Sequence, residues 1–283
     1  MKKNKKRLFP KIKNYNKKAY LKTKKLIESF ELNTICFEAN CPNRYECLSK
    51  KTATFLILGD VCTRNCLYCN VKKGVPKKID LGEPRRIALA IKRLRIEHAV
   101  ITSVTRDDLK DSGAGQFART VREIRSINPN CRIELLIPDL RGNWNALKEV
   151  LNSNPDVVNH NIEVVQELFK ILRPKGNYDL SLKLLKKIKE LNPKITTKSG
   201  FMLGFGENKK QIFKTIIDLY NAECDILTVG QYLQPSKKHF SVKRYYSKKE
   251  FEEIKRFAEK VGFKKVFSGF FVRSSYMAGE MYG

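Results

Sequence analysis

From residue 53 onward, short apolar runs alternate with longer amphipathic segments. The runs are rich in β-branched side chains and are bounded by polar residues, which is typical of strands. The predicted strands are Thr54–Leu58, Ala99–Ser103, Ile133–Ile137, Val157–Asn161, Lys198–Leu203, Ile226–Gly230 and Lys265–Ser268. The amphipathic segments have apolar residues at helical spacing and predict helices at 84–96, 115–127, 144–152, 164–171, 180–191, 208–222 and 247–261.

The regular alternation of strand and helix predicts an α/β fold. It requires a parallel sheet, arranged either as a doubly wound sheet or as a (β/α) barrel. No Gly-x-Gly-x-x-Gly sequence follows the first strand, which disfavours a dinucleotide-binding sheet. A cysteine-rich loop follows that strand instead. In a barrel this loop opens on the C-terminal face, where active sites lie, so we predict a barrel.

The first 52 residues lack this alternation. Residues 1–30 are basic and carry a weak helical stripe, and they predict a mobile arm leading into a short helix. Residues 31–52 have no regular pattern, and we expect them to be irregular and ordered by a bound metal. The predicted divisions are therefore an N-terminal segment at 1–52, a barrel at 53–268 and a C-terminal tail at 269–283.

Composition adds a strong charge asymmetry. The chain carries a net charge of +28, and residues 1–25 hold twelve Lys or Arg and no acidic residue. Codon bias in an AT-rich genome explains such a charge, and so does attraction of an acidic partner. No apolar run approaches the roughly 18 residues that span a bilayer, and the N-terminus lacks the apolar core of a secretory signal. We therefore expect a cytoplasmic protein with no membrane partner.

Six of the eight cysteines lie between positions 36 and 69, and the sharpest group is Cys62, Cys66 and Cys69. In the reducing cytosol, dense cysteines are usually metal ligands or catalytic residues. Three thiolates on one loop can hold three irons of a [4Fe–4S] cluster and leave the fourth open for S-adenosylmethionine (SAM). The C-x3-C-x2-C spacing, with aromatic Tyr68, resembles the radical SAM motif. The alternative is zinc, which prefers four ligands.

A second triplet, Cys36, Cys41 and Cys47, lies just upstream of the first. Three loosely spaced cysteines taken alone could be incidental. Their position before a radical SAM motif instead predicts a second cluster, again one cysteine short, that supplies either electrons or sulfur.

The run from Cys36 to Asn70 resembles lipoyl synthase, and the resemblance extends from about residue 30 to residue 279. The Lys-rich arm does not match, and Lys50-Lys51 stands where that family usually has a Gly. The resemblance implies a partial TIM-type barrel of about six β/α units, whose N- and C-terminal extensions complete a second iron–sulfur site. The further matching blocks are 101–109, 158–163, 197–200, 230–236 and 272–276.

The resemblance also implies a role for Ser275, as the fourth ligand of the auxiliary cluster beside Cys36, Cys41 and Cys47. A hydroxyl is a hard and weak ligand for iron, which suits a site whose ligand must dissociate. Without the resemblance, this serine would be interpreted as part of an exposed turn.

Four polar residues are candidate SAM contacts, three near the ends of predicted strands and one, Arg173, in a Leu-Arg-Pro sequence. They are Asp107, Asn161, Glu163 and Arg173, the last through its planar guanidinium and the SAM carboxylate. For Asp107 the alternative is helix capping, and for Arg173 it is a surface ion pair. Cys131 and Cys224 are predicted to be small core residues.

The function implied is sulfur insertion at C6 and C8 of an octanoyl chain on a carrier-domain lysine. The cofactors implied are two [4Fe–4S] clusters and SAM. The partners implied are octanoylated carrier domains (2-oxoacid dehydrogenase E2 subunits and the glycine cleavage H protein) and an electron donor such as flavodoxin or ferredoxin. Two alternatives remain, a radical SAM methylthiolation enzyme acting on tRNA and a basic, nucleic-acid-binding zinc protein without catalysis. The chain has no room for the RNA-binding domain that the former usually carries, so nucleic acid is disfavoured.

Overall fold

The computed structural model describes residues 15–282, so residues 1–14 of the predicted mobile arm lie outside the described residues. The main sheet has eight strands in the order β1-β2-β5-β6-β7-β8-β9-β10. All neighbours from β2 to β10 pair in parallel, and β1 pairs with β2 antiparallel. The strands are β1 (Asn33–Thr34), β2 (Thr54–Ile57), β5 (His98–Ser103), β6 (Arg132–Leu136), β7 (Val157–Asn159), β8 (Thr196–Leu203), β9 (Ile226–Gln231) and β10 (Lys265–Gly269).

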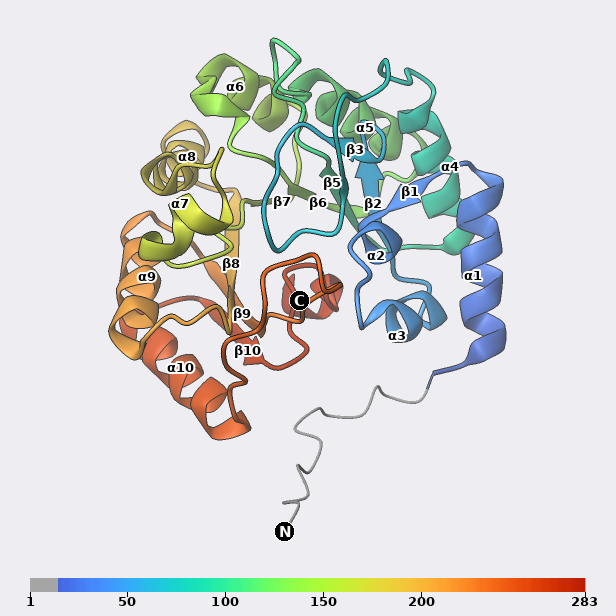
Figure 1. Ribbon diagram of the computed structural model, residues 1–283. Helices are drawn as coiled ribbons and strands as arrows, with labels where there is room; N and C mark the ends of the chain where they lie inside the picture. Colours follow the sequence, from blue (N-terminus) through green and yellow to red (C-terminus); the bar gives the residue numbers. More distant parts are fainter. Residues whose placement is uncertain (1–14, 283) are drawn as a thin grey trace.

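Helices form an outer arc around this curved sheet (Figure 1). Because each parallel strand is followed by a helix that crosses back, the arrangement is the predicted α/β partial barrel. The outer helices are α4 (Glu83–Leu94), α5 (Ala114–Ile127), α6 (Trp144–Asn152), α8 (Tyr178–Leu191), α9 (Lys209–Asn221) and α10 (Lys248–Val261). The remaining helices are α1 (Lys17–Ser29), α2 (Ile35–Glu38), α3 (Arg44–Ser49), η1 (Leu140–Gly142), η2 (Gln166–Leu168), α7 (Phe169–Leu172) and α11 (Ala278–Tyr282).

Helix α10 illustrates how local sequence fixes these elements. Ser247 and Glu250 form a reciprocal capping box at its start. Phe251, Ile254 and Ala258 are buried at helical spacing, so one face packs on the sheet. The helix ends at Gly262, whose φ of 118° is the left-handed conformation that glycine adopts most readily.

Two local predictions are wrong. Residues 31–52 are not irregular, because they form β1, α2 and α3, elements of two to six residues that are too short to show periodicity. The predicted helix at 164–171 is reduced to η2 and α7. Val165, near its beginning, is extended instead (φ −65°, ψ 156°), shortly after Glu163 forms a parallel bridge to Phe201 of β8.

The N-terminal segment and the C-terminal tail lie together at the open side of the barrel (Figure 1). The side-chain amide of Asn43 donates to the carbonyl oxygen of Phe271 at 2.7 Å, and the hydroxyl of Tyr276 donates to Glu46 at 2.8 Å. The tail also presses on β9, because a Cβ at Gly230 would lie 2.1 Å from the carbonyl oxygen of Val272. Within residues 15–282, no helix is both long and apolar enough to cross a membrane.

Candidate active site

The loop that carries Cys62, Cys66 and Cys69 follows β2. Cys62 lies in β3 (Val61–Cys62), which pairs in parallel with β4 (Lys72–Lys73). Helix α7 and the loop after β9 hold the intervening backbone, since Leu67 donates to the carbonyl of Leu172 at 2.9 Å and accepts from the amide of Phe240 at 3.0 Å. The cysteine loop is therefore fixed by contacts from segments more than 100 residues away in the sequence.

Arg64 is the strongest anchor of the cysteine loop. Its Nε and Nη2 donate to the carboxylate of Asp107 at 2.8 and 2.9 Å, and its Nη1 and Nη2 donate to Asp139 at 2.5 and 2.6 Å. The Arg64 side chain is 6% exposed and that of Asp139 is 2% exposed. A planar guanidinium between two carboxylates is a strong, oriented arrangement. We call Arg64, Asp107 and Asp139 the arginine clamp.

Two members of the clamp, Arg64 and Asp139, stay charged at neutral pH. Burial alone would raise the pKa of Asp139, but hydrogen bonds and charge from Arg64 outweigh it and lower the pKa to about 2. The pKa of Arg64 is raised in turn, because its bonds to Asp139 and Asp107 outweigh the cost of burial. Asp107 is thus paired with Arg64, and it is not among the residues that line the cavity described below. The sequence had suggested Asp107 as a contact of SAM.

The second triplet is built by the short N-terminal helices. Cys36 lies in α2, Cys41 follows it, and Cys47 lies in α3. The amide of Cys41 donates to the carbonyl of Cys36 at 3.1 Å, so the two are folded together by one turn. Burial, and then the neighbouring Cys41, raise the pKa of the Cys36 thiol to about 12. The protein alone therefore keeps Cys36 protonated, and a bound metal has to displace this proton.

The C-terminal tail brings Ser274 and Ser275 to the cavity that the two cysteine triplets also line. The amide nitrogen of Asn161, after β7, donates to the hydroxyl of Ser274 at 3.0 Å. This contact joins residues 113 positions apart and fixes the tail against the barrel.

One cavity of about 410 Å³ is lined by all six clustered cysteines and by Ser275. Asn161, Glu163 and Arg173 also line it, so the structure brings three of the four predicted SAM contacts together with the thiols. Among residues 15–282, no three His, Cys, Asp or Glu side chains converge as ligands of one metal ion do. Ligands of a [4Fe–4S] cluster surround a cube instead, with one thiolate on each of several irons.

Glu163 and Arg173 are charged groups within this lining. Glu163 has a φ of 70°, an unfavourable backbone conformation for a non-glycine residue that is held by hydrogen bonds to Gly200 and Met202. Burial raises the pKa of its carboxyl, against the opposing charge of Arg173. The Nη1 of Arg173 donates to the carbonyls of Asn161 and Ile162 at 3.2 and 3.1 Å.

Comparisons with known proteins agree with this geometry. The Radical SAM superfamily profile matches residues 56–219. Lipoyl synthase of Caldicellulosiruptor bescii is 52% identical over 253 residues, which cover 89% of this chain and 87% of that protein. Lipoyl synthase of Alkaliphilus metalliredigens is 52% identical over 257 residues, covering 91% and 89%. The chain belongs to the lipoyl synthase family. The resemblance inferred from its motifs is thus confirmed.

Solved structures of other proteins are similar to this chain in fold. SuiB of Streptococcus suis, bound to SAM, has a TM-score of 0.60 at 12% identity over 89% of this chain and 60% of that one. Methylornithine synthase (PylB) has a TM-score of 0.57 at 13% identity over 91% and 80%. At such low identity these similarities support the partial barrel alone. Family membership implies that this chain uses [4Fe–4S] clusters and SAM.

The lining of the cavity suits a polar ligand such as SAM. Within the described residues, His160 Nε2, Asn161 Oδ1 and Arg173 Nε are buried without a hydrogen-bond partner. Burial and then the charge of Arg173 lower the pKa of His160 to about 4, so its ring is neutral at pH 7. His160 Nδ1 lies 2.8 Å from the carbonyl of Ile137 and must carry the proton, which leaves Nε2 as an acceptor. The cavity therefore offers both donors and acceptors.

Sequence reasoning missed Arg64, Asp139 and His160 as site residues. Arg64 lies between two cysteines of the motif, and that position was the available signal. Asp139 has no motif around it, and only the approach of the loops after β5 and β6 to Arg64 identifies it. Cys131 and Cys224 are buried, as predicted for core residues.

Proposed function

We propose that the chain inserts two sulfur atoms, at C6 and C8, into an octanoyl group in amide linkage to a lysine of a carrier domain. The observation that carries this proposal is the single cavity lined by both cysteine triplets and Ser275. An enzyme that adds sulfur to an unactivated carbon needs its radical source and its sulfur source within reach of one bound chain.

The residues divide into two ligand sets. Cys62, Cys66 and Cys69 would hold the SAM-binding cluster, and Cys36, Cys41, Cys47 and Ser275 would hold the auxiliary cluster. When bound, these groups supply a 5′-deoxyadenosyl radical from SAM and the sulfur atoms for insertion.

The chain's own residues place SAM and exclude water. Glu163 presents a carboxylate for the SAM amino group, and Arg173 presents a guanidinium for its carboxylate. His160 Nε2 accepts a hydrogen bond from the bound ligand, since it has no partner within the described residues. The arginine clamp keeps the cysteine loop in one position, so that SAM and the octanoyl chain meet in a fixed arrangement.

The substrate proteins in this proposal are octanoylated lipoyl carrier domains, namely 2-oxoacid dehydrogenase E2 subunits and the glycine cleavage H protein. The electron donor is a small redox protein such as flavodoxin or ferredoxin. The net charge of +28 supports association with acidic proteins of this kind.

The test is anaerobic reconstitution of the protein with iron and sulfide, followed by SAM, dithionite and an octanoyl-lysine peptide. Mass spectrometry should show the addition of two sulfur atoms. Cys36→Ala should keep SAM cleavage and lose sulfur insertion, whereas Cys62→Ala should lose both.

Sulfur insertion by the Cys36→Ala variant would exclude the auxiliary cluster as the sulfur donor. Bound zinc without acid-labile sulfide in the reconstituted protein would exclude the proposed function altogether. Cys131→Ala serves as a matched control, because Cys131 is buried in the hydrophobic core and does not line the cavity.

A further inference from the structure

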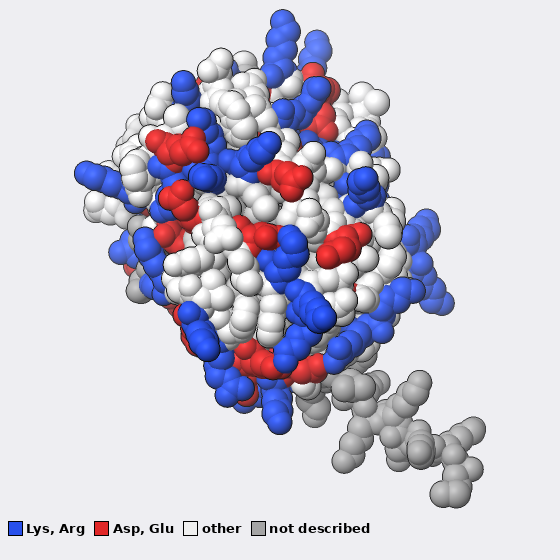
Figure 2. Space-filling view, turned by 90° about the vertical axis from the view of Figure 1, so that its left-hand side faces the viewer, with Lys and Arg blue, Asp and Glu red and all other residues white. Residues whose placement is uncertain are grey.

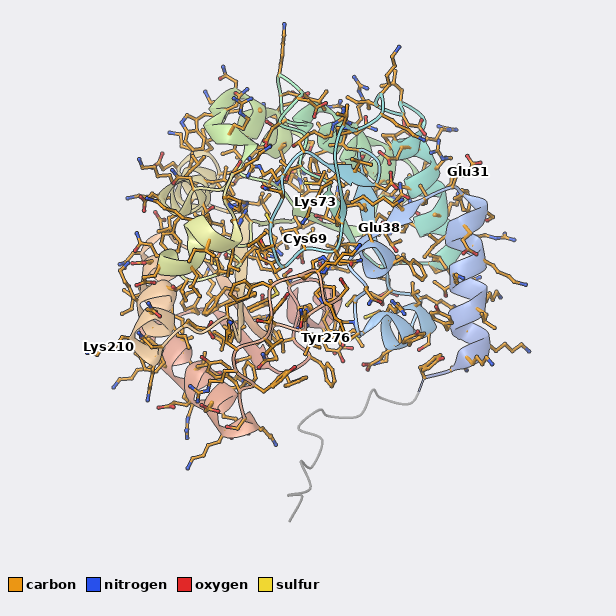
Figure 3. The ribbon with its side chains drawn as sticks, in the orientation of Figure 1. Glu31, Glu38, Cys69, Lys73, Lys210 and Tyr276 are labelled. Atoms are coloured by element: carbon orange, nitrogen blue, oxygen red, sulfur yellow. The ribbon has the colours of Figure 1, made fainter. Side chains whose placement is uncertain are left out.

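The loop at residues 72–82, which we call the basic loop, leaves the site on the strand paired with Cys62. The register aligns Cys62 of β3 with Lys73 of β4, and the amide of Gly74 donates to the carbonyl of Cys62 at 3.1 Å. Figure 3 shows Lys73 and Cys69 in the middle of the barrel face, whereas Lys210 lies at its outer edge. The loop is therefore attached to the rim of the cavity.

The basic loop carries lysines that form no ion pair with other residues in the described part of the chain. Lys72 pairs with Asp60 at 2.6 Å, but within residues 15–282 Lys73, Lys77 and Lys78 form no ion pair. All three are exposed. The one acidic residue of the loop, Asp80, is occupied by Arg86 at 2.7 Å. An anionic surface would therefore find three available ammonium groups here.

The loop also exposes apolar side chains between its lysines. Val75 is 93% exposed and Leu81 is 67% exposed. Pro76 favours an extended backbone at Val75, which projects this side chain from the surface. Apolar contacts surrounded by charge are typical of protein–protein interfaces. The end of the loop is held in place, since Gln116 donates to the carbonyl of Asp80 at 2.8 Å.

The face that carries α8 and α9 is different. There, Lys and Arg are interspersed with Asp and Glu (Figure 2), and neighbouring groups pair, as in Lys187–Glu190 and Lys214–Asp218. Positive charge on that face is largely compensated locally, so it offers a weaker attraction to an acidic partner.

We propose that the basic loop is the docking surface for an acidic carrier domain, with Lys73, Lys77 and Lys78 facing its carboxylates and Val75 in apolar contact. This inference rests on the proposed function, because it identifies how the substrate protein is recognised. A domain seated on this loop has its octanoyl-lysine beside the cavity mouth, because β4 and Cys62 are hydrogen-bonded to each other. The chain thus separates recognition of the domain, at the loop, from recognition of the octanoyl chain, in the cavity.

The test measures binding of a whole octanoylated, acidic carrier domain to the reconstituted full-length protein by titration calorimetry. The triple variant Lys73→Glu, Lys77→Glu, Lys78→Glu should raise the Kd for the domain about tenfold or more, since attraction becomes repulsion. Val75→Asp should weaken binding several-fold. Binding of a short octanoyl-lysine peptide should remain within twofold in every variant.

The matched control is Lys183→Glu, Lys186→Glu, Lys210→Glu, which makes the same change in net charge at exposed positions on α8 and α9. It should leave the Kd for the domain within about twofold of wild type. Equal weakening by both triple variants would overturn the proposal in favour of a general charge effect, and so would no weakening by either. Unaltered iron content and SAM cleavage show that a variant is folded. Absence of sulfurated peptide would count against the proposed function and leave the docking result standing.

Discussion

Arg64 and Asp139, which are 75 residues apart in the sequence, are joined by two hydrogen bonds of 2.5 and 2.6 Å within the barrel mouth. Arg64 belongs to the loop of the first cysteine triplet, and Asp139 belongs to the loop after β6. Their connection ties the cysteine loop to the barrel itself, and Asp107 extends it to the loop after β5.

Asp139→Asn should loosen the cysteine loop, because Arg64 loses a buried counter-charge. We expect a loss of about 1–3 kcal/mol in unfolding free energy and several-fold faster release of iron to a chelator. Since the pKa of Asp139 is about 2, its carboxylate is ionised above that pH, and its contribution should be constant between about pH 6 and 9. Glu190→Gln, which removes a surface ion pair with Lys187, should leave the unfolding free energy unchanged within the error of the measurement.

Glu163→Gln should weaken SAM binding while leaving both clusters intact. A charge-assisted hydrogen bond to the SAM amino group is worth about 1.5–3 kcal/mol, which predicts an increase of roughly tenfold to hundredfold in KM for SAM. The measurement is SAM cleavage without carrier, together with iron analysis. Glu167→Gln is the control, because that residue is exposed and outside the cavity. An unchanged KM in Glu163→Gln would exclude Glu163 from the SAM site.

Ser275→Ala should keep SAM cleavage and lose sulfur insertion, because the auxiliary cluster would lose the fourth protein ligand that we propose for it. The neighbouring Ser274→Ala removes a hydroxyl that accepts from Asn161 and should reduce both activities together. Parallel assays of 5′-deoxyadenosine and of sulfurated peptide distinguish the two serines. If the two variants behave alike, Ser275 has no special role as a ligand.

Lys51→Gly should stabilise the protein. Lys51 has a φ of 59°, a left-handed conformation that disfavours residues with a side chain and that glycine adopts readily. We expect a gain of up to about 1 kcal/mol in unfolding free energy, measured by urea denaturation of the reconstituted protein. Lys50→Gly is the opposite control. Lys50 has a φ of −93°, which residues with a side chain adopt readily, so glycine at this position should lower the unfolding free energy of the protein. A loss of stability in both would contradict the conformational argument.

The sequence by itself determined the alternation of strands and helices. Burial of β-branched runs and the periodicity of amphipathic helices are local properties, so β8 and α10 could be predicted closely from residues 198–203 and 247–261. The cysteine spacing likewise identified the candidate metal ligands, because thiolates close together in the chain are close together in space.

Only the tertiary structure decided which distant groups meet. Asp107 appeared to be a candidate for SAM, but the packing of its loop against Arg64 gives its carboxylate a different partner. Ser275 lines the same cavity as the cysteines. It does so because Gly230 leaves room for the C-terminal tail and Asn161 binds the tail at Ser274. Such contacts depend on how loops from separate strands converge at one end of a barrel, and no local pattern of residues encodes that convergence.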